Sequence, residues 1–344
     1  MYTLGVNAAY HDPAACLVRD GQVIAAAEEE RFTRIKHGKR PIPFSTYLLP
    51  HYAIDYCLRE AGITLKDVDN VAYAYDPYLL LREHQTERSL ALPLEPSANP
   101  TPAEWESAWD PLFLASIVNA PRHLVDNAPF HIQERFRGAR TNGQASFQWR
   151  FVAHHLAHAA SAFLASPFEE AAVMTIDGRG ERATTAYYRG QGSRLEPLGQ
   201  VEMPSSLGLL YERVTEHLGF LHSQDEYKVM ALASFGRPVF LDAICDAIHI
   251  GPGGAYTIDP LDLPAVFGPA RRRGEPLEQR HYDIAHSLQA ALERSVIQLA
   301  GWLRQAGGSS RLCLAGGVAL NCVMNARLRQ SGRVDEIWVQ PAAG

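Results

Sequence analysis

Residues 171–190 read AAVMTIDGRGERATTAYYRG, and residues 14–31 read AACLVRDGQVIAAAEEER. Each stretch consists of an apolar strand, a polar loop that contains glycine, and a returning strand, and Asp20-Gly21 is a strong hairpin signal in the second stretch. A further strand is expected at residues 193–203, after a turn at 190–192. Although two hairpins can also arise by chance, we interpret these copies as related halves of an α/β chain with a boundary near residue 168.

The remaining elements continue this α/β pattern. Residues 3–8 predict a first strand, residues 311–328 predict a strand, a Gly-Gly turn and a helix, and residues 334–341 predict a last strand. Asp283 is expected to cap an amphipathic helix. The apolar positions of that helix are Ile284, Leu288, Leu292, Val296, Leu299 and Leu303. A segment at about residues 80–145, which includes the Pro- and Trp-rich stretch 94–111, is expected to be a surface insertion.

Composition excludes several classes of protein. The formal net charge of -6 argues against general nucleic-acid binding, although a local pocket can still be positive. The first residues lack the basic and apolar regions of a secretory signal, and no apolar run is long enough to span a bilayer. Five scattered cysteines without a C-x-x-C pair fit a reducing cytoplasm. The run Arg271–Arg273 is expected to be solvated.

The histidines of residues 151–166, FVAHHLAHAASAFLAS, are the clearest candidates for metal binding. His154 and His158 are four residues apart, so on a helix they project from one face and can share a divalent ion. Two ligands do not complete a site, and a third, expected to be a carboxylate, must come from elsewhere. The alternative is a pair of partly buried histidines bonded to the backbone.

Two glycine turns are candidates for nucleotide contacts. Asp177 through Glu181 (DGRGE) joins two strands, and Gly178 and Gly180 allow a phosphate to approach the backbone. The acids of this turn are candidates for substrate contact or for a base, whereas an ordinary acidic turn is the alternative. Gly316 and Gly317 lie between a strand and a helix, where a nucleotide can bind or where tight packing alone requires glycine.

Charged pairs elsewhere add further candidates. His11 and Asp12 follow the first strand, at a position where open α/β sheets commonly bind ligands. Glu30, Arg31, Lys36 and His37 form a dense charge run that is either solvated surface or a site for a phosphate or carbamoyl group. Glu226 and Lys228 enter an apolar helix that ends in glycine.

Eight segments, taken together and in this order, resemble the carbamoyltransferase family of nodulation protein U and of the cephamycin and tobramycin carbamoyltransferases. They are GVNAAYHDPAACLV (5–18), AAAEEERFTRIKH (25–37), HHLAHAASAF (154–163), DGRGE (177–181), SLGLLYERVTEHLGF (206–220), EYKVMALASFG (226–236), LAGGVALN (314–321) and VQPAAG (339–344). They cover nearly the whole chain. One departure is Tyr227, where members of the family usually have glycine.

The resemblance implies a Kae1-like form of the duplicated fold of actin, Hsp70 and sugar kinases, with subdomains at 1–168 and 169–344. It implies that His154 and His158 are ligands of iron or another divalent metal, with His155 as the rival for one place. It also implies a third ligand, an aspartate of a D-A-G motif directly after P-A-A-x, and a following YrdC-like domain that makes carbamoyladenylate from carbamoyl phosphate and ATP. Neither lies within the 344 residues, so a truncated, inactive fragment is expected.

These implications combine into a hypothesis of acyl transfer. Carbamoyladenylate would bind in the cleft between the halves, with its adenosine near Gly316, Gly317 and Asn321, and the metal would polarise the carbonyl. A hydroxyl of a small-molecule acceptor would attack, with Asp12 or His11 as base and Asp177 and Glu181 as rivals. The identity of the acceptor is not readable, and oligomers are compatible with this hypothesis. A kinase or ATPase of the same superfamily and a non-catalytic nucleotide-binding scaffold are the alternatives.

Overall fold

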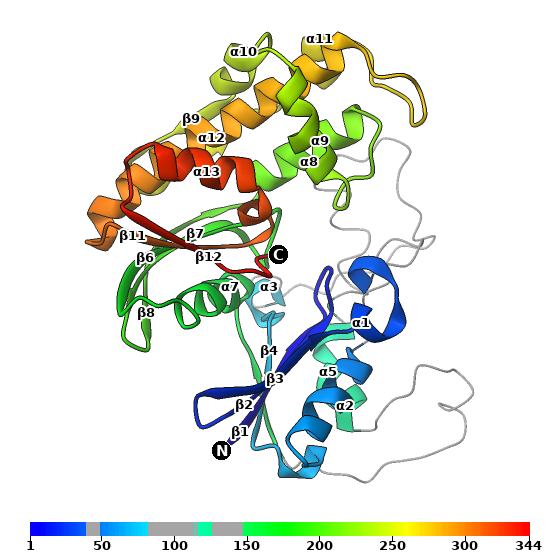
Figure 1. The fold of residues 1–344 in the computed structure, drawn as a ribbon, viewed down its shortest axis with the longest axis vertical. Coiled ribbons are helices and arrows are strands. Elements are labelled where there is room, and N and C mark those ends of the chain that lie inside the picture. Colours follow the sequence, from blue (N-terminus) through cyan, green and yellow to red (C-terminus); the bar gives the residue numbers. More distant parts are fainter. Residues whose placement is uncertain (39–48, 82–113, 115, 126–146) are drawn as a thin grey trace. The chain divides into compact units, whose positions relative to one another are not determined.

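A computed structural model describes residues 1–38, 49–81, 114, 116–125 and 147–344. Within these residues the chain forms two compact units, Met1–His154 and His155–Gly344, each with its own sheet (Figure 1). The expected surface insertion at about 80–145 lies largely outside the described residues, and the stretch 94–111 lies wholly outside them.

The N-terminal unit contains a five-stranded sheet in the order β3-β2-β1-β4-β5. Its strands are β1 (Tyr2–Asn7), β2 (Ala14–Arg19), β3 (Gln22–Glu28), β4 (Asn70–Tyr73) and β5 (Gln148–Phe151). The first three strands pair antiparallel, whereas β4 is parallel to β1 and to β5. The hairpin turn between β2 and β3 is at Asp20-Gly21, where φ is 50° and 82°. These are the left-handed values that a two-residue turn of this kind requires.

Short helices accompany this sheet. They are α1 (Glu30–Thr33), η1 (Lys36–Gly38), α2 (His51–Glu60), η2 (Leu65–Asp67), α3 (Tyr78–Leu81) and α5 (Ala120–Val125). Helix α2 buries Ala53, Ile54 and Cys57 in the same core as Leu4 and Leu17 of the sheet. Its N-terminus is held by the buried carboxylate of Glu29, which accepts hydrogen bonds from the backbone N–H groups of residues 52 and 53.

The C-terminal unit repeats the same sheet. Its strands are β6 (Glu170–Ile176), β7 (Ala183–Gln191), β8 (Arg194–Glu202), β11 (Arg311–Ala315) and β12 (Glu336–Val339), in the order β12-β11-β6-β7-β8. Again three strands form an antiparallel meander, and the first of them pairs in parallel with a later strand. The repeat that the two hairpins predict is therefore confirmed, because both sheets share one order and one set of strand directions.

Helices make up most of the rest of this unit. They are α7 (His154–Phe163), α8 (Leu207–His217), α9 (Glu226–Leu232), η3 (Ala233–Phe235), α10 (Leu241–Asp246), η4 (Pro252–Gly254), α11 (Leu263–Phe267), α12 (Gln279–Gly307), η5 (Gly317–Leu320) and α13 (Cys322–Gln330). A small sheet of β9 (Ile248–Ile250) and β10 (Tyr256–Ile258) accompanies them. The buried face of α12 packs against β6 and α8 in the main core.

Helix α12 begins earlier than the sequence predicts. The expected cap, Asp283, lies inside the helix, and the N-cap is Glu278 in a capping box with His281. The carboxylate of Asp283 instead accepts hydrogen bonds from the backbone N–H of Arg237 and the side chain of Gln279. The prediction of this cap was wrong because a capping residue and a buried acceptor for a neighbouring loop look alike in sequence.

The boundary between the units lies between His154 and His155, the first two residues of α7, whereas the sequence suggests a boundary near residue 168. Helix α7 packs on the second sheet, because Ala159, Ala162 and Phe163 are buried with residues of β6 and β11. This contact requires glycine at residue 190, since a Cβ there would lie 2.7 Å from ring atoms of Phe163. From residue 155 onward the helix therefore belongs to the C-terminal unit.

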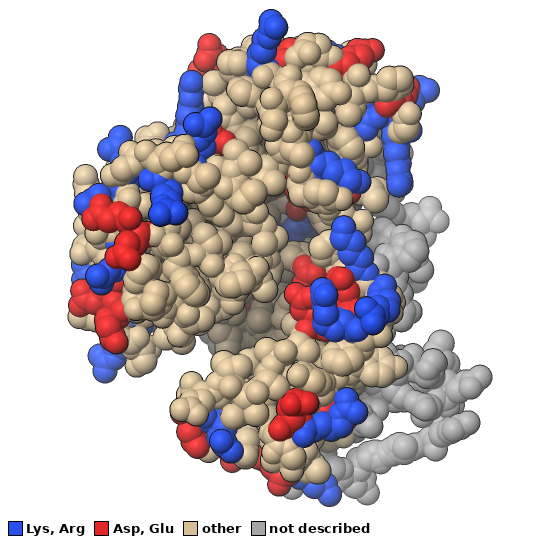
Figure 2. All heavy atoms as spheres, viewed as in Figure 1, with Lys and Arg blue, Asp and Glu red and all other residues tan. Residues whose placement is uncertain are grey.

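The surface carries mixed charge. On the face drawn in Figure 2, acidic and basic side chains are interspersed, without a continuous basic band among the described residues. Arg271, expected to be solvated, is instead buried, and it donates to the carbonyl oxygens of Leu218, Gly219 and Glu275. In the described part of the chain, every helix is too short or too polar to cross a membrane.

Candidate functional site

Helix α7 presents three histidines at its start, directly after β5 and a short link. Its alanine-rich sequence favours a helix and lets it pack closely on the sheet. His154 and His158 are one turn apart on this helix, so their side chains project from one face. The helix therefore places His154 and His158 on one face, as their spacing in the sequence predicts.

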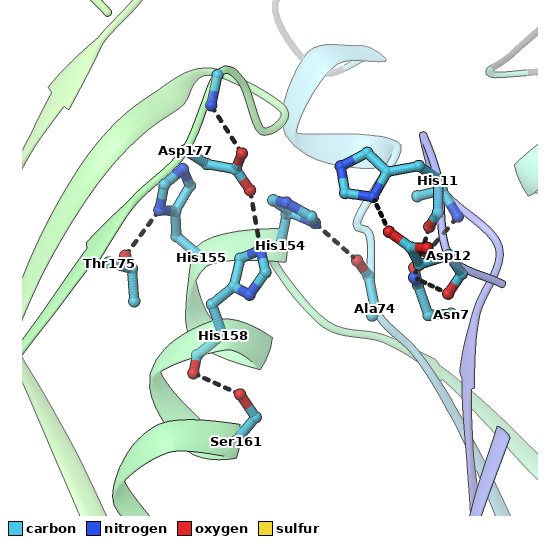
Figure 3. A network of polar contacts seen from close by, with 12 residues as sticks. Asn7, His11, Asp12, Ala74, His154, His155, His158, Ser161, Thr175 and Asp177 are labelled. Carbon is cyan, nitrogen blue, oxygen red and sulfur yellow. Dashed lines mark hydrogen bonds and ion pairs between the residues drawn. The ribbon is translucent and has the colours of Figure 1, made fainter. Parts of the chain in front are cut away.

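Asp177 completes a cluster with these two histidines. It follows the last residue of β6, and its Oδ2 lies 2.9 Å from Nε2 of His158 (Figure 3). One ligand atom from each of His154, His158 and Asp177 lies within 4.8 Å of the others. The His158 and Asp177 side chains are only 11% and 10% exposed. The three groups form a nearly buried set of two imidazoles and one carboxylate, a set that suits Fe²⁺, Mn²⁺ or Zn²⁺.

The second nitrogen of His154 is oriented by the backbone. Its Nδ1 lies 3.4 Å from the carbonyl oxygen of Ala74, and the ring meets that of Tyr10 edge-on at 5.4 Å between centroids. Histidines that bind metals commonly donate one ring N–H to a carbonyl, which fixes the tautomer and leaves the other nitrogen for the ion. The surroundings of His154 fit this arrangement.

His155 differs from its neighbours. Its Nδ1 lies 2.7 Å from the hydroxyl of Thr175, and its Nε2 lies 2.9 Å from the carbonyl oxygen of Ala183. Both ring nitrogens are thus engaged by strands β6 and β7, and the ring is buried. The geometry favours His154 and His158 over His155 as the metal pair.

The turn from Asp177 to Glu181 packs tightly against neighbouring elements. A Cβ at Gly178 would lie 3.1 Å from Oε1 of Glu212, and one at Gly180 would lie 2.9 Å from the ring of His155. The hydroxyl of Ser206 donates to the carbonyl oxygen of Gly178, which ties the turn to the start of α8. Close packing therefore accounts for Gly180 without a ligand, whereas the atom near Gly178 is the end of a flexible side chain. Glu181 is buried.

The Gly316-Gly317 turn adjoins this cluster. Gly316 has a φ of 92°, and a Cβ there would lie 2.3 Å from the carbonyl oxygen of Ile176. Its N–H donates to the carbonyl oxygen of Ala343, and a Cβ at Gly317 would lie 3.1 Å from Oδ1 of Asp177. Residues 316, 317 and 343 are thereby placed beside the strand end that carries Asp177.

Asn321 has structural partners. Its Oδ1 caps α13 by accepting from the N–H of Met324, and its amide exchanges hydrogen bonds with Gln289 of α12. Tyr211 also donates to Gln289. The amide of Asn321 is therefore held in place with most of its hydrogen-bonding capacity already used.

A second polar cluster lies at the end of β1 and contains His11, Asp12, Glu30 and His37. Each oxygen of the Asp12 carboxylate contacts one imidazole, at 2.7 Å from Nδ1 of His11 and 2.9 Å from Nδ1 of His37. Burial raises the pKa of Asp12, but the hydrogen bonds from these imidazoles outweigh burial and hold that pKa well below its usual range. Asp12 is therefore an ionised acceptor and a weak base.

Asn7 is a residue of this cluster that sequence reasoning missed. Its side-chain amide donates to the carbonyl oxygens of His11 and Asp12 and holds the turn after β1 (Figure 3). The signal available in the sequence is a polar residue as the last position of an apolar strand. That signal is weak because many strands end in polar residues.

The other charged candidates are exposed or form contacts with residues near them in the sequence. Arg31 is exposed and pairs with Glu28 at 2.9 Å, and Lys36 is also exposed. Lys228 pairs with Asp225 at 2.7 Å, rather than with Glu226, whose carboxylate accepts from the N–H of Ser223. The ammonium of Lys228 also lies 5.7 Å from the ring centroid of Tyr227, the residue that departs from the family pattern.

Among solved structures, HypF of T. kodakarensis matches 98% of this chain with a TM-score of 0.52 at 12% identity, and 44% of that chain is covered. At this identity the likeness concerns the fold alone. Together with the two sheets of equal topology, it shows a duplicated α/β fold of the kind found in actin, Hsp70 and the sugar kinases.

Comparison of the sequence with known families identifies the family of this chain. A model described as the carbamoyltransferase N-terminus matches residues 2–344, so the chain belongs to the carbamoyltransferase family. An uncharacterised protein of Synechocystis sp. is 40% identical over all of this chain and 55% of its own length. Nodulation protein NolNO of Sinorhizobium fredii is 37% identical over 98% of this chain and 45% of its own length. The chain thus spans about half the length of these relatives.

Proposed function

We propose that the protein transfers a carbamoyl group from carbamoyladenylate to a hydroxyl group of a small molecule, with a divalent ion held at His154 and His158. The observation that carries this proposal is the convergence of two imidazoles and the Asp177 carboxylate in a chain of the carbamoyltransferase family. The donor set fits Fe²⁺, the ion that the resemblance implies. When bound, such an ion supplies a Lewis acid for the carbonyl group.

Two alternative roles for Asp177 fit this proposal. It contacts His158 directly, so it is either a ligand itself or the group that orients a histidine ligand. The resemblance names a different third ligand, an aspartate directly after the P-A-A-G segment. Ala343 is hydrogen-bonded to Gly316 beside Asp177, which supports an approach of that segment to the cluster.

The donor nucleotide is assigned to the turn after β11. We set its adenosine against Gly316, Gly317 and Asn321, with the DGRGE turn close by. Because the N–H of Gly316 already bonds to Ala343 and the Asn321 amide bonds to Gln289, recognition of the adenosine would rely on the shape of this turn more than on either of these two groups.

His11 is the preferred proton acceptor for the hydroxyl. The lowered pKa of Asp12 makes it a poor base, and both of its oxygens contact imidazoles. A carboxylate that binds Nδ1 of a histidine orients the ring and leaves Nε2 to take a proton from a hydroxyl. In this scheme Asp12 positions the ring of His11, and Asp177 is a member of the metal cluster.

The test compares the wild-type protein with a His154→Ala/His158→Ala variant, both in the full-length protein. We expect the variant to lose about one equivalent of bound metal, measured by mass spectrometry of the desalted protein. We also expect it to lose at least 100-fold in the transfer of labelled carbamoyl from carbamoyl phosphate, in the presence of ATP, to a panel of amino sugars and oligosaccharides. His249→Ala, an exposed histidine on the small hairpin, is the control and should behave as wild type.

Two outcomes would favour the alternative functions. Transfer of labelled phosphate from ATP to the acceptor would favour a kinase. Unchanged metal content and activity in the double variant would favour a nucleotide-binding scaffold and would remove this site from consideration.

A further inference from the structure

The N-terminal unit contains a second set of metal-type donors, and one of them, Asp12, also positions His11 in the proposed transfer. Asp12, Glu30 and His37 each offer one ligand atom within 4.8 Å of the other two. They come from three separate segments: the turn after β1, the start of α1 and the 3-10 turn η1. Their side chains are 29%, 28% and 33% exposed, so they are held by the fold and still open to an ion.

The spacing of these donors suits a small ion. Two donors at about 2.1 Å from one ion, at a right angle, lie about 3.0 Å apart. Oδ1 of Asp12 and Nδ1 of His37 are 2.9 Å apart. An ion could therefore take the place of the proton between them without movement of either backbone segment.

The charge of this cluster also favours a cation. Asp12 and Glu30 bring two carboxylates together, and the Arg31 guanidinium, 3.4 Å from Glu30, is bound more closely to Glu28. Like charges at this separation are unfavourable unless a positive charge lies between them. A divalent ion would supply that charge more completely than an imidazolium.

Hydrogen bonds from neighbouring groups hold the three side chains in place, as is usual for metal ligands. His11 holds the second oxygen of Asp12, and the backbone N–H of His37 donates to Oε2 of Glu30. The N–H of Asp12 donates to the carbonyl oxygen of His37, which joins the two loops directly. Asp12 and His37 both have left-handed backbone angles, at φ of 50° and 56°. Such angles are costly for residues other than glycine and are held here by the surrounding contacts.

We propose that Asp12, Glu30 and His37 bind a second divalent cation in the N-terminal unit, with His11 orienting Asp12. Two carboxylates and one imidazole suit Mn²⁺, Fe²⁺ or Zn²⁺ better than an all-oxygen ion such as Ca²⁺. This site shares no residue with the cluster of His154, His158 and Asp177.

The experiment measures Mn²⁺ binding by the loss of the electron paramagnetic resonance signal of free Mn²⁺. The parent protein is the His154→Ala/His158→Ala variant, so the remaining binding reports the second site. We expect this parent to bind one Mn²⁺ per chain. Adding Glu30→Gln should weaken the affinity at least tenfold, because one charged ligand is lost, and adding His37→Gln should do the same.

Glu28→Gln in the same parent is the matched control, since Glu28 lies on the same hairpin and pairs with Arg31 outside the cluster. It should keep the affinity of the parent. A parent that takes up no Mn²⁺, or a Glu30→Gln variant that binds as well as the Glu28→Gln variant, would overturn the proposal. Because two ligand variants are tested, misfolding of one, seen by circular dichroism, leaves the other to decide. Failure of carbamoyl transfer would leave this result unaffected.

Discussion

His155 and His158 lie on one helix, three residues apart, and their environments differ completely. His155 is clamped between Thr175 and Ala183, whereas His158 faces Asp177. The residue type alone does not separate these roles, because a neutral imidazole is equally suited to bridge two strands and to bind an ion. At the scale of single residues, the surrounding donors and acceptors decide the chemistry.

His51 illustrates a residue whose surroundings change its titration. It is the first residue of α2, and burial, together with the charge of His123, lowers its pKa to about 4. Because the folded pKa is lower than that of the unfolded chain, about 6.5, the folded state binds fewer protons between these values. The stabilising contribution is therefore complete above pH 6.5 and is lost as the pH falls towards 4.

We accordingly expect a His51→Gln variant to be less sensitive to acid than the wild type. Between pH 7.5 and pH 5, the free energy of unfolding of the wild type should fall by about 2 kcal/mol more than that of the variant. Urea unfolding at the two pH values measures this difference. Equal losses in both proteins would show that His51 does not titrate in this range.

At the scale of elements, the close approach of α8 to the DGRGE turn positions Asp177. A Cβ at Gly208 would lie 2.6 Å from the backbone N of Gly178 and 2.7 Å from the carbonyl oxygen of Asp177. Both obstacles are backbone atoms, which cannot rotate away as a side chain can. The helix and the turn must therefore separate to accommodate any side chain at residue 208.

A Gly208→Ala substitution should therefore destabilise the protein by about 1–3 kcal/mol, the usual cost of overpacking, and should weaken metal binding at the Asp177 cluster. Thermal unfolding and metal content of the desalted protein measure these effects. Gly199→Ala on β8 is the control, because a Cβ there meets only ordinary contacts at 3.8 and 3.9 Å. Equal stability and metal content in the two variants would contradict a tight contact between α8 and the turn.

At the scale of the whole molecule, the two units share a sheet topology but have different helices. The N-terminal unit inserts short helices between β3 and β4, whereas the C-terminal unit inserts α8 to α12 between β8 and β11. Both candidate metal clusters include an aspartate from the loop after the first strand of a sheet: Asp177 directly follows β6, and Asp12 lies five residues after the end of β1. The duplicated fold thus places a polar loop after the first strand of each sheet.

The chain spans about half the length of its relatives, and the resemblance assigns the synthesis of carbamoyladenylate to a further, YrdC-like domain. We therefore expect residues 1–344 alone to release no AMP from ATP in the presence of carbamoyl phosphate. A coupled assay for AMP measures this activity, and the full-length protein serves as the positive control. Release of AMP by the 344-residue chain that depends on carbamoyl phosphate would contradict this division of labour.

The sequence by itself determined the duplicated hairpins, the long amphipathic helix before the Gly316-Gly317 turn, and the spacing of His154 and His158 on one face of a helix. These features depend on local periodicity, on turn residues such as Asp20-Gly21 and on the 3.6-residue repeat, all of which act between residues near in the chain. The family motifs are also short stretches of neighbouring residues, so their order could be recognised without a structure.

Only the tertiary structure decided which groups meet. It joined Asp177 to His158, engaged both nitrogens of His155, and brought Asp12, Glu30 and His37 together from separate segments. It also showed that Asp283 accepts bonds from a loop instead of capping a helix. These contacts depend on how strands and helices pack, and the same side chains satisfy their hydrogen bonds differently in each packing arrangement.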